Sequence, residues 1–268
     1  MLRKAFLSCI ALSVCIALPM SGTASPQPPA NLTAAQIVEK SVSAKGGLQA
    51  WRGVQTISFS GKMDAGGKAK VQLPFVLEKK RPGKTRIELV FANDTAVQVY
   101  DGVNGWKLRP FLGRRDVEPY SPEELKSAAF ESDLDGPLVD YATKGNKVEL
   151  EGVEKVENHD AYKLKLTMKG GQVQHIWVDA ETFLDVKVEG TPRRMDGKMR
   201  PVSIYLRDYK DVNGLMIPYV IETAVQGYKV TRSMFIENVV LNPKLEDSLF
   251  TKPSPQPQTQ AQTQAKSK

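Results

Sequence analysis

The chain has 268 residues, of which 37 are Lys or Arg and 30 are Asp or Glu, so its formal net charge is +7. The positive excess is small and spread along the chain, and no basic block alternates with stacking aromatic residues. We therefore expect no nucleic-acid binding, whereas transient contact with an anionic membrane surface is compatible with this charge.

Residues 1–24 have the pattern of a secretory signal peptide. Arg3 and Lys4 form a short basic region, an uncharged apolar stretch follows, and small residues precede the expected cleavage after Ala24. The apolar stretch is too short for a spanning helix, although a retained membrane anchor is the alternative. We therefore expect a soluble periplasmic protein.

Cleavage would remove both cysteines of the chain, Cys9 and Cys15. Neither is placed as a lipidation site requires, and without them the mature chain has no disulfide, thiolate nucleophile or cysteine metal ligand. Loss of Arg3 and Lys4 would leave 35 basic against 30 acidic residues, a charge of +5.

Residues 25–253 are expected to form a single domain, because β-rich folds of this length often remain undivided. The tail, residues 254–268, contains Pro, Gln, Thr, Ser, Ala and Lys but no large apolar residue. Such a segment cannot bury enough surface to offset the entropy of ordering, so we predict a disordered tail.

The domain begins with a predicted helix and continues as strands. Thr33 and Gln36 form a capping-box pattern, apolar residues recur at helical spacing up to Val42, and Gly46 follows as a stop. A short helical turn is predicted over residues 48–51. From residue 57 onward apolar and polar residues alternate between turn residues, which is typical of antiparallel hairpins.

This alternation predicts about ten or eleven strands, mostly paired with their neighbours in sequence. One apolar set belongs to residues 87–91, and another is Leu164 and Leu166 alternating with Lys163 and Lys165. An up-and-down sheet of this size must curl, close or be covered. The predicted fold class is therefore mainly β with helices (α+β), a half-open antiparallel β-barrel.

Residues 121–143 interrupt the strands with a predicted helix. Ser121 is followed by Pro122 and two acidic residues, the order expected at a helix start, and Gly136-Pro137 breaks the helix. We expect this segment to cover one end of the barrel, either as a permanent plug or as a mobile lid. The carboxylate pair Asp133 and Asp135 is expected to be solvated in a loop.

Residues that would carry catalysis or bind a metal are sparse. His159 is expected in a turn and His175 on a strand, far apart in sequence and without metal-ligand spacing. No nucleophile elbow, phosphate-binding loop or dinucleotide motif is present in the sequence. We therefore expect no enzyme activity, no metal and no cofactor.

Arg114-Arg115 and Arg193-Arg194 are expected in loops, either solvated or in contact with lipid phosphate or an acidic partner.

Four short strings stand out: Arg81-Pro82-Gly83-Lys84 at a hairpin, Asp101-Gly102 followed by Trp106, the stretch Tyr209 to Pro218, and the closing run from Leu241-Asn242-Pro243 to Leu249-Phe250. In these strings the chain resembles the LolA-type periplasmic lipoprotein carriers and outer membrane lipoprotein-sorting proteins. The resemblance covers most of residues 31–253. It implies a helical lid over an apolar cavity that takes acyl chains, which agrees with the strand pattern.

The resemblance implies a non-enzymatic carrier of lipoproteins or other lipids toward the outer membrane, with an inner-membrane exporter and an outer-membrane acceptor as partners. A lipid- or lipoprotein-sensing regulator of envelope stress is the alternative, and a lipid hydrolase is disfavoured because nucleophile and base are missing. The expected cavity-lining residues are Phe75, Leu77, Ile87, Leu89, Phe91, Trp106, Leu164 and Leu166, and the expected lid residues are Leu125, Ala128, Ala129 and Phe130.

Overall fold

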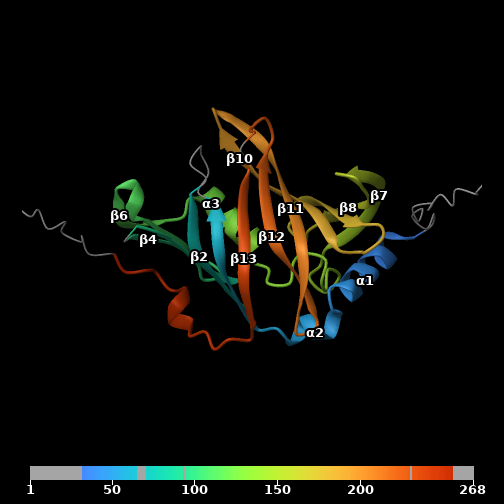
Figure 1. Ribbon diagram of the computed structural model, residues 1–268, viewed down its shortest axis with the longest axis horizontal. Helices are drawn as coiled ribbons and strands as arrows, with labels where there is room; N and C mark the ends of the chain where they lie inside the picture. Colours follow the sequence, from blue (N-terminus) through green and yellow to red (C-terminus); the bar gives the residue numbers. More distant parts are fainter. Residues whose placement is uncertain (1–31, 65–70, 93, 230, 256–268) are drawn as a thin grey trace, which may run out of the picture.

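The structure, a computed structural model, describes residues 32–64, 71–92, 94–229 and 231–255. The expected signal peptide and residues 256–268 of the expected tail lie outside these ranges. Within them the chain forms thirteen strands in one antiparallel sheet, with three α-helices and two 3₁₀ turns (Figure 1).

The strands are β1 (Thr56–Asp64), β2 (Gln72–Lys80), β3 (Lys84–Phe91), β4 (Asp94–Tyr100), β5 (Gly105–Arg109), β6 (Arg114–Pro119), β7 (Lys147–Val156), β8 (His159–Thr167), β9 (Val173–Asp179), β10 (Asp185–Met195), β11 (Lys198–Val212), β12 (Leu215–Val225) and β13 (Arg232–Leu241). The helices are α1 (Ala34–Ala44), α2 (Leu48–Gly53) and α3 (Pro122–Glu131), and the 3₁₀ turns are η1 (Pro110–Leu112) and η2 (Asp247–Phe250).

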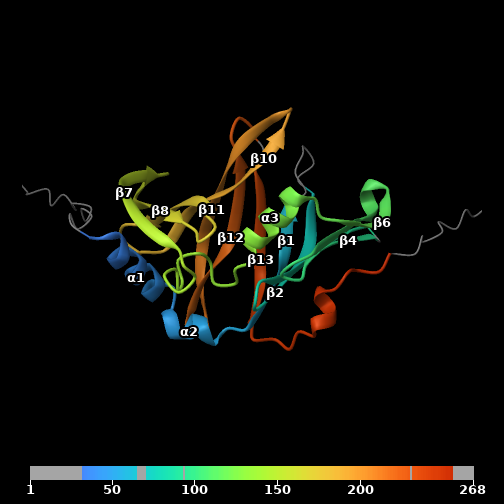
Figure 2. The ribbon, with the colours of Figure 1, turned by 180° about the vertical axis from the view of Figure 1, so that it is seen from behind.

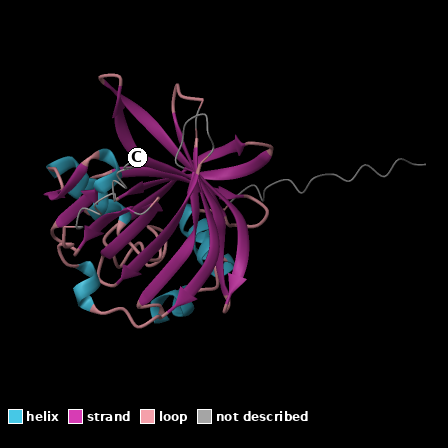
Figure 3. Cartoon of the chain, turned by 60° about the vertical axis from the view of Figure 1, so that its left-hand side comes forward, coloured by secondary structure: helices cyan, strands magenta, loops and turns pink. Residues whose placement is uncertain are grey.

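The sheet consists of two meanders that are joined where the first strand pairs with the last. Its strand order is β6-β5-β4-β3-β2-β1-β13-β12-β11-β10-β9-β8-β7, so β1 pairs with β13 in the middle, and β6 and β7 are the two edges. The sheet is curved, with a helix inside the curve (Figure 3). We call the face that carries α1 and α3 the inner face and the opposite one the outer face.

The expected count of ten or eleven strands is too low, and the missed elements are at the edges. The sequence pattern predicts no separate strand for β6 or β7, and both have few fully buried residues. β6 is polar on both faces and shows no alternation, and in β7 the alternation of Val148 and Leu150 with charged residues is interrupted by a register shift at Gly152. The remainder of the interruption, residues 132–143, forms bends and turns.

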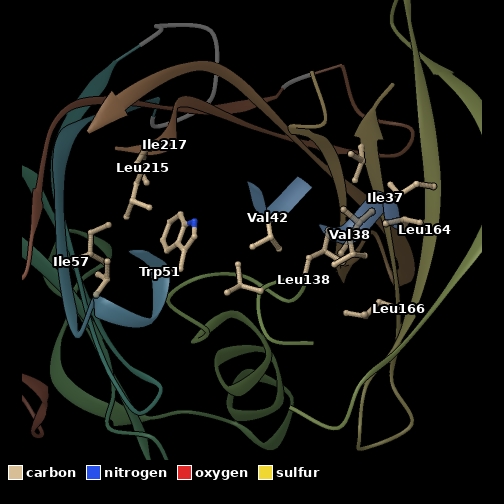
Figure 4. Packing of buried hydrophobic residues seen from close by; sticks show 14 of the residues in the cluster. Ile37, Val38, Val42, Trp51, Ile57, Leu138, Leu164, Leu166, Leu215 and Ile217 are labelled. Carbon is tan, nitrogen blue, oxygen red and sulfur yellow. The ribbon is translucent and has the colours of Figure 1, made fainter. Parts of the chain in front are cut away.

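The main core lies on the inner face. α1 begins at the expected capping box, in which Thr33 N donates to Gln36 Oε1 at 2.9 Å and Gln36 N donates to Thr33 Oγ1 at 3.3 Å. Its apolar stripe and Trp51 of α2 pack against inward side chains of the sheet (Figure 4). Each such side chain contributes roughly 1.5–3 kcal/mol by leaving water. The stripe of α1 is Ile37, Val38 and Val42, and its partners include Leu138, Leu164, Leu166, Leu215 and Ile217.

The expected alternation of faces along β8 is confirmed. Leu164 and Leu166 are fully buried on the inner face, whereas Lys163 and Lys165 are on the outer face in ion pairs with β7. All strand pairs among the described residues are antiparallel, as the hairpin pattern predicts.

The segment after β13 covers part of the outer face. Phe250 of η2 is buried against Val97, Val99 and Leu108 of β4 and β5. Asn242 fixes the start of this segment, because its Oδ1 accepts a hydrogen bond from Gln55 N at 2.7 Å. The run that begins at Leu241 is therefore an anchored strap across the sheet.

Candidate functional site: the inner face beneath α3

α3 starts as its sequence predicts. Ser121 N donates to Glu124 Oε2 at 2.8 Å, and Glu124 N donates to Ser121 Oγ at 3.2 Å, which completes a capping box. Pro122 occupies the first turn, where its missing N–H costs nothing. The helix runs across the inner face and lies in front of the central strands in Figure 2.

Two contacts attach the N-terminal end of α3 to the sheet. Lys107 Nζ of β5 forms an ion pair with Glu124 Oε2 at 2.5 Å. The ring of Tyr120, just before the helix, lies where a side chain of residue 105 would be, since a Cβ on Gly105 would lie 2.0 Å from its Cδ2 atom. Any larger residue at position 105 would displace Tyr120, so this glycine is required for the close approach.

A lysine caps the C-terminal end of α3. Lys79 Nζ of β2 donates to the carbonyl oxygens of Glu131 at 2.9 Å and Asp133 at 3.0 Å. A cation at this end satisfies carbonyl groups that have no partner within the helix and complements its dipole. Burial lowers the pKa of Lys79, and the neighbouring acids Asp133 and Glu131 oppose this effect.

The segment after α3 is held by a cluster of charges, which corrects the expectation that Asp133 and Asp135 are solvated. Lys144 Nζ lies 2.6 Å from Asp133 Oδ2 and 2.8 Å from Asp135 Oδ1, and Arg81 Nη2 lies 2.6 Å from Asp135 Oδ2. The side chain of Asp135 is only 3% exposed. Arg81 also donates to the carbonyl oxygens of Trp51 and Val54, so one guanidinium joins α2, β2 and this segment.

The two carboxyl groups have opposite pKa shifts. Burial raises the pKa of Asp133 to about 6, and its hydrogen bond to Asp135 adds to this effect. Burial alone would raise the pKa of Asp135 as well, but hydrogen bonds to Asp133, Lys144 and Arg81 outweigh it and hold this pKa below its ordinary value. The pair therefore takes up one proton, held on Asp133, as the pH falls to about 6.

Replacing Asp133 with asparagine is expected to flatten the stability profile between about pH 4 and pH 6. The folded pKa exceeds the unfolded one, so this group stabilises the fold at low pH and loses that contribution as the pH rises to about 6. In the parent protein we expect this pH-dependent change in the free energy of unfolding to be about 1 kcal/mol, because the side chain is part-exposed. The amide of the variant does not titrate, so the variant should lack this change. Urea denaturation across this range measures it; Asp208→Asn, at an exposed ion pair, is the control. A slope identical to that of the parent protein would contradict the prediction.

The inner face beneath α3 is apolar but incompletely buried. On β1 to β3 and β10 to β13, a set of large hydrophobic side chains points into the curve of the sheet and keeps partial exposure, although neighbours on the same strands such as Ile57 and Phe75 are buried. This differs from the region next to α1, where inward side chains are fully buried. The half-buried set is Phe59, Leu77, Ile87, Leu89, Val188, Ile204, Leu206, Ile221 and Met234.

The structure divides the expected cavity residues into three groups. Leu77, Ile87 and Leu89 lie together in the half-buried set, and Phe91 follows at the end of β3 with 46% exposure. Phe75, Leu164 and Leu166 are fully buried in the main core. Trp106 pairs with Val99 and packs with the outer-face cluster, so it does not share a face with the other seven.

The expected lid residues are all in α3, and none is fully buried. Leu125, Ala128 and Phe130 are half-buried, and Ala129 is exposed. The helix is thus fixed by charges at both ends, while apolar side chains on its body and on the sheet below retain accessible surface. Two apolar surfaces that face each other in this way can bind flexible apolar chains, because part of the area of each remains accessible.

The other features of the described chain do not add to this surface. A pocket of about 420 Å³ lies on the outer face under η2, with polar residues such as Arg86, Glu88 and Ser248 in its lining. His175 lies between Glu189 and Glu151 on the outer face, far along the sheet from His159. The described residues hold no cluster of three or more His, Cys, Asp or Glu suited to a metal ion. None of their helices is long and apolar enough to span a membrane.

Sequence reasoning did not identify the residues that hold the covering segment, namely Lys79, Arg81, Lys107 and Lys144. Each is a basic residue in a chain rich in them, and nothing local marks its partner. The weak signal was that Lys79 continues the inward set of Phe75 and Leu77 at period two, since an inward lysine needs a partner when it leaves water.

No family model and no curated protein matches this chain. Several solved structures match this chain in fold. A LolA superfamily protein from Nitrosomonas europaea matches with a TM-score of 0.53 and 16% identity, covering 83% of this chain and 99% of its own. A chain described as an outer membrane lipoprotein-sorting protein domain, from Vibrio parahaemolyticus, matches with a TM-score of 0.55 and 15% identity, covering 82% and 96%.

A DUF1329 family protein from Desulfovibrio piger matches with a TM-score of 0.54 and 15% identity, covering 81% of this chain and 97% of its own. Identities this low carry the fold and not the activity. The three matches cover most of both chains, and they show that this chain has the LolA-like fold.

Proposed function

We propose that the protein is a periplasmic, non-enzymatic carrier that binds the acyl chains of lipoproteins or other lipids on the inner face beneath α3. The observation that carries this proposal is the half-buried apolar set on the central strands, faced by a helix whose own apolar side chains are half-buried. The fold shared with a lipoprotein-sorting domain supports it. Delivery toward the outer membrane, from an exporter to an acceptor, belongs to the same proposal.

The energy available is sufficient for such binding. Transfer of each CH₂ group from water contributes about 0.8 kcal/mol, so a chain of common length supplies roughly 10 kcal/mol before ordering costs. No catalytic group is needed for this. Covering the chain with α3 would also shield the part of it that the sheet does not reach.

The test is a pair of substitutions on β3 that differ only in the face they alter. Leu89→Glu places a carboxylate in the half-buried set, where Leu89 lies opposite Phe75 and Ala96. Val90→Glu, one residue later, places the same charge on the outer face, where Val90 is 40% exposed. Titration with a fluorescent fatty acid or lipopeptide measures the dissociation constant.

We expect Leu89→Glu to weaken binding at least about tenfold, since a charge against an acyl chain costs several kcal/mol. Val90→Glu should bind as the parent protein does. Both variants should unfold cooperatively, because water can reach a carboxylate at position 89. Equal binding by the two variants would remove the inner face as the site, and equal loss would point to a general effect of charge.

A further inference from the structure

The hairpin formed by β10 and β11 ends in a cluster of cations. Its far end stands above the neighbouring strands in Figures 1 and 2, and it turns at Asp196-Gly197. In its register Arg193 is directly opposite Arg200, Arg194 opposite Met199, and Met195 opposite Lys198. We call Arg193, Arg194, Lys198 and Arg200 the basic tip.

The pairing within the basic tip is unfavourable by itself. Like charges directly across two strands destabilise a sheet. None of the four cations makes an ion pair within the described residues, whereas elsewhere on the sheet lysines such as Lys163 lie beside two glutamates. Every Asp and Glu of the sequence is in the described ranges, so residues outside them hold no further acidic side chain.

The acidic residues around the basic tip form no ion pair with its four cations. Glu131 and Glu123 of α3 act on Arg193 and Arg194 through space but form no ion pair with them. The acid within the turn, Asp196, accepts a hydrogen bond from the hydroxyl of Tyr228. Thr191 of β10, two residues before Arg193, donates from Oγ1 to Glu131 Oε1 of α3 at 3.5 Å, so this part of the hairpin lies beside the C-terminal end of α3.

The neighbouring hairpin holds the basic tip in shape. Gln226 N, between β12 and β13, donates to Pro201 O at 2.9 Å, and the guanidinium of Arg200 lies 6.0 Å from the ring centroid of Tyr228. The same turn adds Lys229, which is exposed. The cations therefore lie on two hairpins that contact each other.

One apolar side chain accompanies the cations at the far end. Met199 is 56% exposed, more than most large hydrophobic residues of the described chain, and it lies opposite Arg194. An exposed flexible thioether among unpaired cations is suited to the headgroup region of a bilayer, where cations meet phosphate and the side chain reaches the acyl boundary.

We propose that the basic tip docks the protein on a bilayer surface that contains anionic phospholipid. Each cation near such a surface contributes about 1 kcal/mol, which converts to roughly a fivefold change in partitioning. This is a weak and reversible attachment, next to α3 and to the face on which we propose that acyl chains bind. The inference goes beyond that proposal and does not depend on it, because docking is measured without cargo.

The test uses the mature full chain and sedimentation with vesicles. Neutral phosphatidylcholine vesicles are compared with vesicles that also contain about 30% phosphatidylglycerol, at low salt and at about 0.5 M salt. The test variant is Arg193→Gln/Arg194→Gln/Lys198→Gln, which leaves the half-buried Arg200 in place. The control, Lys147→Gln/Lys169→Gln/Lys252→Gln, removes three exposed lysines on other elements and changes the net charge equally.

The parent protein should bind the anionic vesicles only and be released by salt. The tip variant should bind about a hundredfold more weakly, and the control should lose no more than about threefold. Arg193→Lys/Arg194→Lys should bind like the parent protein. Absence of binding by the parent protein, or equal loss in both triple variants, overturns the proposal. Loss in the Arg-to-Lys variant also overturns it, since it indicates a partner that needs the guanidinium fork.

Discussion

Replacing Asp185 with alanine is expected to destabilise the protein by about 3–5 kcal/mol, because it leaves a buried cation without a partner. Lys45 Nζ, just after α1, lies 2.6 Å from Asp185 Oδ2 of β10, and the two side chains are 8% and 13% exposed. Ser41 of α1 donates to the other carboxylate oxygen at 3.0 Å. Removal of this carboxylate therefore leaves Ser41 of α1 and the adjacent Lys45 without their partner in the core.

Chemical denaturation measures this effect, and two variants act as controls. Asp160→Ala breaks an exposed pair with Lys155 and should cost less than about 1 kcal/mol. The double variant Lys45→Met/Asp185→Leu should recover much of the loss, since it removes both charges together. If Asp185→Ala costs no more than Asp160→Ala does, the pair does not hold α1 to the sheet.

A disulfide between positions 83 and 132 is expected to slow the uptake of acyl chains at least about tenfold. A Cβ at Gly83 would lie 3.8 Å from Cβ of Ser132, which is the usual separation of about 3.8 Å across a disulfide. The bond would fix the C-terminal end of α3 to the β2–β3 hairpin. If α3 must move away from the sheet to admit a chain, fixing this end hinders the movement.

The double variant Gly83→Cys/Ser132→Cys is compared with itself after reduction, and stopped-flow fluorescence with a labelled fatty acid measures the rate. The φ of +61° at Gly83 costs a cysteine about 1–2 kcal/mol, but this cost is the same in both redox states. The single variant Ser132→Cys controls for the thiol. Equal rates in the oxidised and reduced forms would indicate that this end of α3 stays in place during uptake.

Local patterns predicted the helix starts and the strand faces correctly. The capping boxes at Thr33 and Ser121 depend on residues three positions apart, and the alternation around Leu164 depends on the pleat of a single strand. Signals of this kind need no information from elsewhere in the chain. The edge strand β6 lacks such a signal because it is polar on both faces, and in β7 the signal is short because a register shift at Gly152 interrupts the alternation.

The residues of the candidate site were only partly predictable. Period two assigns Leu77, Ile87 and Leu89 to one face, and the structure brings them together. The same pattern cannot tell Leu166, buried under α1, from Leu89, half-buried under α3. It also could not show that Trp106 faces outward, because that depends on its register with Val99 in the next strand.

Spacings within a few residues are enough to place the starts of helices and strands and to say which side chains share a face. The depth at which each face is buried, and which charges meet, follow from the folded chain alone. Arg81 and Asp135 are 54 positions apart, and Lys45 and Asp185 are 140. Contacts over such separations depend on the path of the chain around the sheet, which no local pattern specifies.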